Sequence, residues 1–376
     1  MVNIISGIGS FESFGKLKNL YSGKSILLVT GQASFRSCGA EKVLNFILKN
    51  EKVEKFSDFS VNPKLEDAER GVAIAIEANT EVIIAVGGGS VIDMAKLIKA
   101  LYSTPNLAIK IAKGEVSMTN PEIPLIVAPT TAGSGSESTH FAVVYIGADK
   151  YSLASTLLLP ETVILDGKLT ASGSSYQKAC NGLDALSQAI ESAWAVGSTE
   201  TSRQLSFKAV TLCVKYLKNV VDGANDESSL QGMLDAANLA GQAINTSKTT
   251  AAHAWSYGIT SQYGLPHGHA VWLTLPAIFQ IHANIIPARV TDARGAEHLN
   301  DVISNLMNSL SISSSKQAAS TLKDYLTSIN INIDMVKFGL DTKIKRKQLS
   351  QNVNMQRMGN NPVQFSTEDV NSIFDL

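Results

Sequence analysis

The first half of the chain alternates short apolar runs with segments of helical periodicity. Ser25–Thr30 (SILLVT) and Glu81–Val86 (EVIIAV) are almost continuously apolar, which is typical of strands buried on both faces of a parallel sheet. Further strands are predicted at Val53–Phe59 and Ile123–Ala128, and helices at Ala40–Leu48, Leu65–Asn79 and Val91–Tyr102. This order predicts parallel strands joined by right-handed crossovers, with ligands bound beyond the carboxyl ends of the strands.

The pattern changes from about Leu169, where long amphipathic stretches replace the apolar runs. Proline is sparse there and runs of β-branched residues are few. Helices are predicted at Tyr176–Ala195, Thr201–Val221, Ser228–Asn245 and Val290–Leu310. We therefore predict two domains: an α/β, Rossmann-like parallel-sheet domain over residues 1–168 and an all-α helical bundle over residues 169–376.

Composition excludes several classes of protein. The 376 residues are 44% hydrophobic and 17% charged, which suits a large buried core rather than a disordered chain. The 32 basic and 33 acidic residues leave a net charge of −1, which argues against a nucleic-acid-binding face. No run approaches the roughly 20 apolar residues that span a bilayer, and we expect no membrane partner. The N-terminus lacks the basic flank and apolar run of a signal peptide. Three scattered cysteines, Cys38, Cys180 and Cys213, are expected to be reduced thiols of a cytoplasmic protein.

Two glycine- and hydroxyl-rich turns follow predicted strands. The first, GGGSVID, runs from Gly87 to Asp93 and leads into a predicted helix. Glycines allow a backbone to approach a pyrophosphate closely, and a helix N-terminus offers oriented N–H donors. The second, TTAGSGSE, runs from Thr130 to Glu137. A single turn of this kind also fits an ordinary strand-to-helix connection, but two of them after two parallel strands favour a nucleotide site.

A second group of polar residues lies in the helical half. Asp184 and Gln188 are four residues apart and share a helix face, and His253 and Tyr257 repeat this spacing. His267 follows His253 by 14 residues, and three of the six histidines of the chain lie between residues 253 and 269. A carboxylate and two imidazoles on different helices can hold a divalent cation. Each residue also fits a structural role, so spacing alone leaves both interpretations open.

Several long motifs occur together in one order. They are GGGSVIDMAK, PTTAGSGSE, KYSLASTLLLPETVILD and GLDALSQAIES, followed by the His253/His267 pair and GNNPV. In this order they resemble the iron-containing (group III) alcohol dehydrogenase family over nearly the whole chain. The resemblance implies a dehydroquinate synthase-like fold, in which a metal and a nicotinamide meet between an N-terminal dinucleotide-binding domain and a C-terminal helical domain. Dimers are common in the family, so a homodimer is expected.

The resemblance also assigns cofactor contacts, residue by residue. It implies that the pyrophosphate contacts Gly87, Gly88, Gly89, Ser90 and Asp93, and that Thr130, Thr131 and Ser134 lie beside the nicotinamide and phosphates. NAD-preferring members tend to carry an acid after the first strand, which binds the ribose hydroxyls. Here that strand is followed by Gly31, Ser34 and Arg36, with no carboxylate. NADP(H) is therefore favoured over NAD(H), although Arg36 also fits an ordinary surface residue.

Three family metal ligands match Asp184, His253 and His267. The fourth, a histidine in the family, is Gln188 here, and a neutral amide is a poor ligand for Fe2+ or Zn2+. Three protein ligands and an open position suit a catalytic metal, and operation without a metal remains an alternative. Tyr257 stands where the family often has a proton-relaying histidine. His269 is expected to take over that relay, or to be a solvent-facing residue at a helix start.

The substrate clue is Lys248, which lies five residues before His253 among the hydroxyl side chains of NTSKTT. Such a group can bind a phosphonate, phosphate or carboxylate by charge-assisted hydrogen bonds, but it also fits a capping turn with an exposed lysine. The surrounding motifs resemble the phosphonoacetaldehyde reductase branch of the family. That branch reduces phosphonoacetaldehyde to 2-hydroxyethylphosphonate. Alternatives are a dehydrogenase for small uncharged alcohols, a dehydroquinate synthase-like lyase and a non-catalytic nucleotide-binding protein.

Overall fold

The computed structural model describes residues 2–119, 122–147, 149–224 and 226–376. By its internal contacts the chain forms two compact units, described separately here: unit 1 comprises 1–173 and 226–238, and unit 2 comprises 174–225 and 239–376. None of the described helices is both long and apolar enough to cross a membrane.

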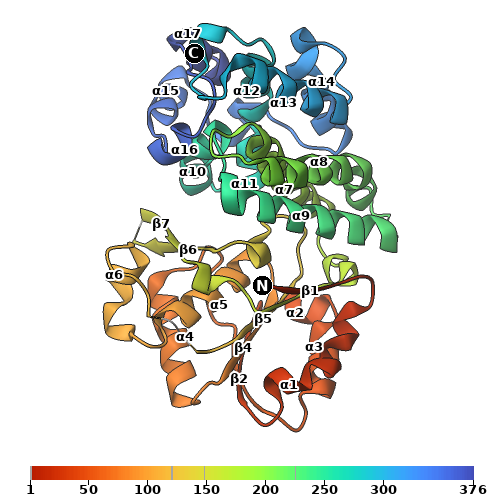
Figure 1. Cartoon of the computed structure of the whole chain (residues 1–376), viewed down its shortest axis with the longest axis vertical. Helices are drawn as coiled ribbons and strands as arrows, with labels where there is room; N and C mark the ends of the chain where they lie inside the picture. The colour runs from red at the N-terminus through yellow and green to blue at the C-terminus, as the bar shows by residue number, and fades with distance from the viewer. Residues whose placement is uncertain (1, 120–121, 148, 225) are drawn as a thin grey trace. The chain divides into compact units, whose positions relative to one another are not determined.

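Unit 1 is built on a parallel six-stranded sheet (Figure 1). In spatial order the strands are β1 (Asn3–Ser6), β8 (Thr162–Leu165), β5 (Leu125–Pro129), β4 (Val82–Gly87), β2 (Ser25–Thr30) and β3 (Lys52–Phe56). Each neighbouring pair is parallel, as the alternation of strands and helices predicts. The predicted strand at Val53–Phe59 ends earlier, at Phe56, and β3 is an edge strand with four exposed residues.

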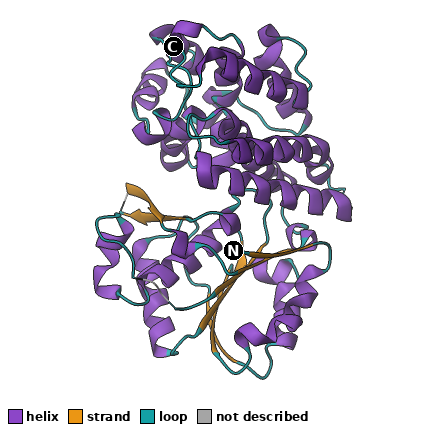
Figure 2. Ribbon diagram, in the orientation of Figure 1, coloured by secondary structure: helices purple, strands orange, loops and turns teal. Residues whose placement is uncertain are grey.

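Helices cover both faces of this sheet (Figure 2). Because side chains alternate along a strand, Leu27 and Val29 join one core cluster while Ile26 and Leu28 join the other. The first face carries α4 (Leu65–Glu77), α5 (Gly89–Leu101) and α6 (Ala108–Ala112). The second carries α1 (Lys18–Tyr21), α2 (Ser34–Ser37) and α3 (Ala40–Ile47). The predicted helices here are confirmed to within about two residues at most ends.

An antiparallel hairpin, which the sequence reading did not predict, also belongs to unit 1. It consists of β6 (Phe141–Ile146) and β7 (Asp149–Ala154). Its first strand is fastened to α5 by a fully buried lysine: the Lys96 ammonium donates to the carbonyl oxygens of Ser136 and Thr139 at 2.6 Å and of Phe141 at 2.9 Å. Lys96 thereby holds both the hairpin and the end of the TTAGSGSE turn.

Unit 2 is helical (Figure 2). Its helices are α7 (Ser175–Trp194), α8 (Glu200–Val221), α10 (Ala251–Tyr263), α11 (His267–Trp272), α12 (Leu275–Ala283), α13 (Gly295–Ser309), α14 (Ala318–Ser328), α15 (Lys343–Gln351), α16 (Met355–Met358) and α17 (Thr367–Phe374). The helix predicted at Val290–Leu310 begins five residues later, because Arg294 is held by Asp292 and by the carbonyls of Ala195 and Ser198.

Helix α9 (Glu227–Ser247) contributes to both units, so a single boundary at residue 168 does not describe the chain. Its first half is bound to the strand ends of unit 1. The Gln231 side chain donates to the Leu165 carbonyl at 3.1 Å, and Ser6 donates to Asp235 at 2.9 Å. Asn238 donates to Glu137 at 3.0 Å. These contacts place residues 226–238 with the sheet rather than with the bundle.

Replacing Lys96 by Met is expected to destabilise unit 1 by at least about 3 kcal/mol, because each buried carbonyl left without a donor costs about 1 kcal/mol or more. Thermal unfolding should show the loss, and hydrogen exchange should rise in residues 130–143. Lys99→Met is the matched control, since Lys99 is equally buried on α5 but pairs with Glu161. Exchange that rises equally in both variants would contradict this role for Lys96.

Candidate cofactor turns and metal centre

The two glycine-rich turns lie side by side at the carboxyl ends of β4 and β5. The Thr130 N–H donates to the Gly87 carbonyl at 3.0 Å. A Cβ on Gly88 would lie 3.2 Å from the Thr131 side chain, and one on Gly89 would lie 2.7 Å from Ser134 Oγ. The two turns therefore pack closely against each other at Gly88 and Gly89, where a larger residue would require Thr131 or Ser134 to shift. Helix α5 begins at Gly89, so its free N–H groups open onto this edge.

The other predicted cofactor residues occupy the same edge, with one exception. Gly31 follows β2, and a Cβ on it would meet Ser34 Oγ at 2.2 Å. Ser90 accepts a hydrogen bond from the Asn62 N–H at 3.3 Å. Asp93 is the exception, because its carboxylate is turned toward the protein: one oxygen accepts from Ser136 Oγ and the other from the Val143 N–H. Asp93 thereby holds the second turn and the hairpin, and its contact with the pyrophosphate stays a prediction.

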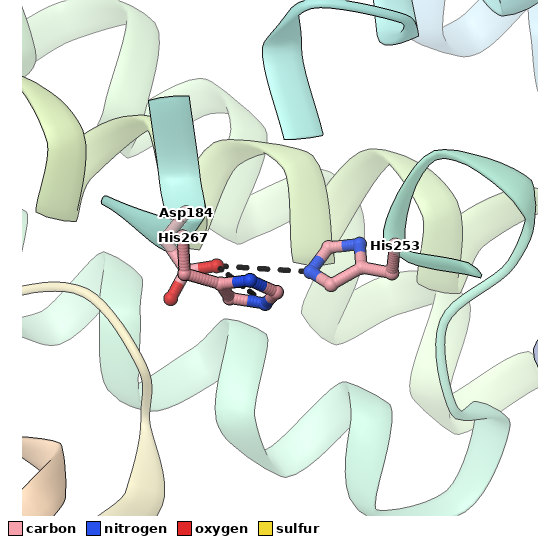
Figure 3. Close-up of side chains that lie close together, drawn as sticks. All are labelled: Asp184, His253 and His267. Carbon is pink, nitrogen blue, oxygen red and sulfur yellow. Dashed lines mark ion pairs between the residues drawn. The ribbon is translucent and has the colours of Figure 1, made fainter. Parts of the chain in front are cut away.

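Asp184, His253 and His267 are brought together in unit 2, as Figure 3 shows. Asp184 Oδ1 lies 3.6 Å from His253 Nε2 and 3.9 Å from His267 Nε2, and one ligand atom from each residue lies within 4.8 Å of the others. Donors of a tetrahedral ion with bonds of about 2.1 Å stand roughly 3.4 Å apart. The three groups therefore fit a single divalent cation after small side-chain adjustments.

A glycine permits this arrangement. Gly268 follows His267 in α11, and a Cβ on it would lie 2.0 Å from the Cys180 carbonyl oxygen and 2.8 Å from the Asp184 backbone nitrogen. Helix α11 thus touches the backbone of α7 one turn before Asp184. Any larger residue would separate the helices and with them His267 from Asp184.

Glu191, which the sequence analysis did not single out, orients His253. The fully buried Glu191 carboxylate hydrogen-bonds His253 Nδ1 and accepts from Thr250 Oγ1 at 2.7 Å and the Ala252 N–H at 2.9 Å. This leaves His253 Nε2 facing Asp184, buried and, among the described residues, without a hydrogen-bond partner. In metal sites, a carboxylate commonly hydrogen-bonds the ring nitrogen of a ligating histidine that does not bind the metal, as Glu191 does here. The spacing of residues 184, 188 and 191 places them on one helix face and could have identified Glu191 from the sequence.

The electrostatics of the cluster also favour a cation. Burial alone lowers the pKa of His253, but the Glu191 and Asp184 carboxylates outweigh it and raise this pKa to about 9. The site therefore stabilises positive charge even without a metal ion. Gln188 lies one turn after Asp184, and its buried Oε1 makes no hydrogen bond within the described chain. That carbonyl oxygen can accept a hydrogen bond, and within the described residues none is donated to it; it is therefore available to a metal ion or to a metal-bound water.

Three further predicted residues lie in unit 2. The Tyr257 ring stacks on His267 with centroids 5.8 Å apart. His269 is buried, its Nδ1 hydrogen-bonds Tyr176 at 2.8 Å and its Nε2 the Asn332 carbonyl at 2.6 Å. His269 thus bridges Tyr176 and Asn332, and its burial contradicts the solvent-facing alternative. The proton relay through His269 stays a prediction. Lys248 lies in the turn between α9 and α10 that leads to His253.

Comparisons with known proteins extend this picture. Residues 2–167 match the model for iron-containing alcohol dehydrogenases, and residues 178–376 match that for the C-terminal part of the Fe-containing alcohol dehydrogenase family. The chain is 33% identical to the probable alcohol dehydrogenase EutG of Escherichia coli over 60% of its own length and 58% of that protein's. It is 32% identical to the phosphonoacetaldehyde reductase of Streptomyces viridochromogenes, over 65% and 64% of the two lengths.

Among solved structures, the sulfoacetaldehyde reductase of Bifidobacterium kashiwanohense in complex with NAD+ superposes with a TM-score of 0.87. It is 26% identical, and the match covers 100% of this chain and 96% of that one. Since the two family models together cover nearly the whole chain, the fold and family expected from the motifs are confirmed. The chain belongs to the iron-containing alcohol dehydrogenase family.

Proposed function

We propose that this enzyme reduces a short aldehyde with an anionic substituent to the corresponding alcohol, and that the substrate is phosphonoacetaldehyde. The observation that carries this proposal is the conformation and setting of Lys248. Its backbone is left-handed, with φ +61°, a region that costs a non-glycine residue about 1 kcal/mol or more. Its ammonium group makes no ion pair or hydrogen bond within the described residues.

The turn around Lys248 is held rigidly. The Asn360 side chain donates to the carbonyls on both sides of it, to Ser247 at 2.8 Å and to Thr249 at 2.9 Å. Thr250, the next residue, donates to Glu191, the carboxylate that orients His253. Lys248 therefore lies in a strained turn that is hydrogen-bonded, through Thr250 and Glu191, to the candidate metal ligand His253. A cation in this position suits the recognition of an anionic substrate.

The names of two relatives support the same substrate class. Phosphonoacetaldehyde and sulfoacetaldehyde are both two-carbon aldehydes that carry an anionic group, and they are the substrates in the names of a sequence relative and a structural neighbour.

The residues of unit 2 have distinct roles in this proposal. Asp184, His253 and His267 would hold Fe2+ or Zn2+, and Glu191 keeps His253 Nε2 directed at the cluster. When bound, the cation polarises the carbonyl oxygen and the dinucleotide supplies the hydride. Lys248 binds the phosphonate and so fixes the aldehyde end of the substrate. Tyr257, stacked on His267, is our candidate for delivering the proton to the product oxygen.

In unit 1 the coenzyme would bind along the edge formed by Gly31, Ser34 and the glycine turns. We propose a preference for NADP(H). The Arg36 side chain is largely exposed, and its guanidinium pairs with Glu41 at 3.2 Å. Exposed pairs of this kind contribute little stability, so its guanidinium can turn to a 2′-phosphate beside Ser34.

Steady-state reduction of phosphonoacetaldehyde and of propanal, each with NADPH and NADH, tests the proposal. We expect kcat/KM at least about 100-fold higher for phosphonoacetaldehyde, because propanal cannot form the charge-assisted bond, worth about 1.5–3 kcal/mol, or the charge attraction that adds to it. We also expect NADPH to be preferred. Equal or faster turnover of propanal would overturn the phosphonate assignment but not the enzyme class, and equal use of NADH would overturn the coenzyme preference.

Lys248→Gly separates recognition from folding. The substitution removes the strain of a left-handed non-glycine residue, which is about 1 kcal/mol. This gain offsets the backbone entropy that glycine loses on folding, which costs about 0.5–1 kcal/mol. We therefore expect an unchanged melting temperature and a KM for phosphonoacetaldehyde raised about tenfold or more, with propanal unaffected. Lys248→Gln, which keeps the strain, should show the same loss of recognition. Similar KM values for wild type and both variants would remove Lys248 from the substrate site.

A further inference from the structure

Among the residues that the structure describes, every arginine except one in unit 2 has an acidic partner. Among the seven arginines of the sequence, six lie within 4.0 Å of a carboxylate: Arg36, Arg70, Arg203, Arg289, Arg294 and Arg346. Within the described residues, the guanidinium of Arg357 in α16 makes neither an ion pair nor a hydrogen bond. Its Nη1 is nevertheless buried.

This arrangement is unfavourable unless something else accepts those N–H groups. A buried charged donor loses its water without gaining a partner, and buried polar groups in proteins are almost always paired. Arg357 is only half-buried, so part of its guanidinium still faces solvent from which a ligand can arrive. The planar guanidinium presents parallel N–H donors that match two oxygens of a phosphonate.

The position of α16 connects Arg357 to the substrate turn. The Asn354 N–H, just before α16, donates to the Ala254 carbonyl at 3.3 Å, next to His253. Asn360, just after it, makes the paired hydrogen bonds to the carbonyls that flank Lys248. The segment 354–360 therefore runs from the metal-ligand end of α10 to the Lys248 turn, and Arg357 lies midway along it.

We propose that Arg357 is a second anion-binding residue, which binds the phosphonate together with Lys248. This inference rests on the proposed function and deepens it, since two cations match a dianion better than a monoanion. Arg357 is thus a specificity-determining residue that selects a phosphonate over a sulfonate or carboxylate of the same length. In the absence of substrate, the buried Nη1 of Arg357 has no hydrogen-bond partner among the described residues, and a bound phosphonate would supply one.

Binding of methylphosphonate to the full-length protein, measured by calorimetry, tests this without requiring turnover. We expect Arg357→Gln to weaken binding at least about tenfold and Arg357→Lys, which keeps the charge but loses the paired donors, to weaken it less. Lys347→Gln, an exposed charge on α15, is the control and should bind like wild type. Methylsulfonate should bind wild type more weakly than methylphosphonate. Unchanged methylphosphonate affinity in Arg357→Gln, or no binding by wild type, would overturn the inference.

Kinetics distinguish the substrate anion from the coenzyme phosphates. In Arg357→Gln the KM for phosphonoacetaldehyde should rise about tenfold or more, while the KM for NADPH and the melting temperature stay unchanged, since no protein partner is lost. A rise confined to the NADPH KM would overturn the inference. If wild type prefers phosphonoacetaldehyde and Arg357→Gln keeps that preference, the inference fails and the proposed function stands. If wild type prefers propanal, the proposed function fails even where methylphosphonate binding still depends on Arg357.

Discussion

The candidate metal site depends on the contact between the backbones of α7 and α11 at Gly268. Because a Cβ there would lie 2.0 Å from the Cys180 carbonyl, only glycine lets the two helices meet at this distance. His267 begins α11, and the Asp184 nitrogen is itself part of the contact. The position of one ligand relative to another is therefore set by backbone packing rather than by the flexibility of side chains, as a pre-organised site needs.

A buried charge pair completes the same site. Glu191 has no exposed surface, and a carboxylate so placed is tolerated only when it is paired and hydrogen-bonded. The Glu191 carboxylate is hydrogen-bonded to His253, to Thr250 and to the Ala252 N–H. These hydrogen bonds join α7 to the start of α10. The turn that carries Lys248 precedes this junction directly. Substrate recognition and metal ligation in our proposal thus share one polar network within unit 2.

The central strands, the helices and the candidate metal residues could be predicted from the sequence, because each is encoded in a short stretch of the chain. Continuous apolar runs such as Ser25–Thr30 predicted the central strands, and the clustering of histidines predicted that His253 and His267 belong to one candidate metal site. The remainder depended on tertiary partners. Asp93 turns inward because the unpredicted β6–β7 hairpin supplies the Val143 N–H, and the buried position of His269 depends on Tyr176, far along the chain. Arg357 becomes notable only once the partners of the other arginines are known.

The most direct test of the metal centre is the divalent-metal content of purified protein after loading with Fe2+ or Zn2+, measured by mass spectrometry. We predict about one ion per chain for wild type and for Gly15→Ala, a glycine with open space around it. Gly268→Ala, which retains every ligand, should lose the ion while circular dichroism still reports a helical fold. Full metal content in Gly268→Ala, or none in wild type, would contradict the account.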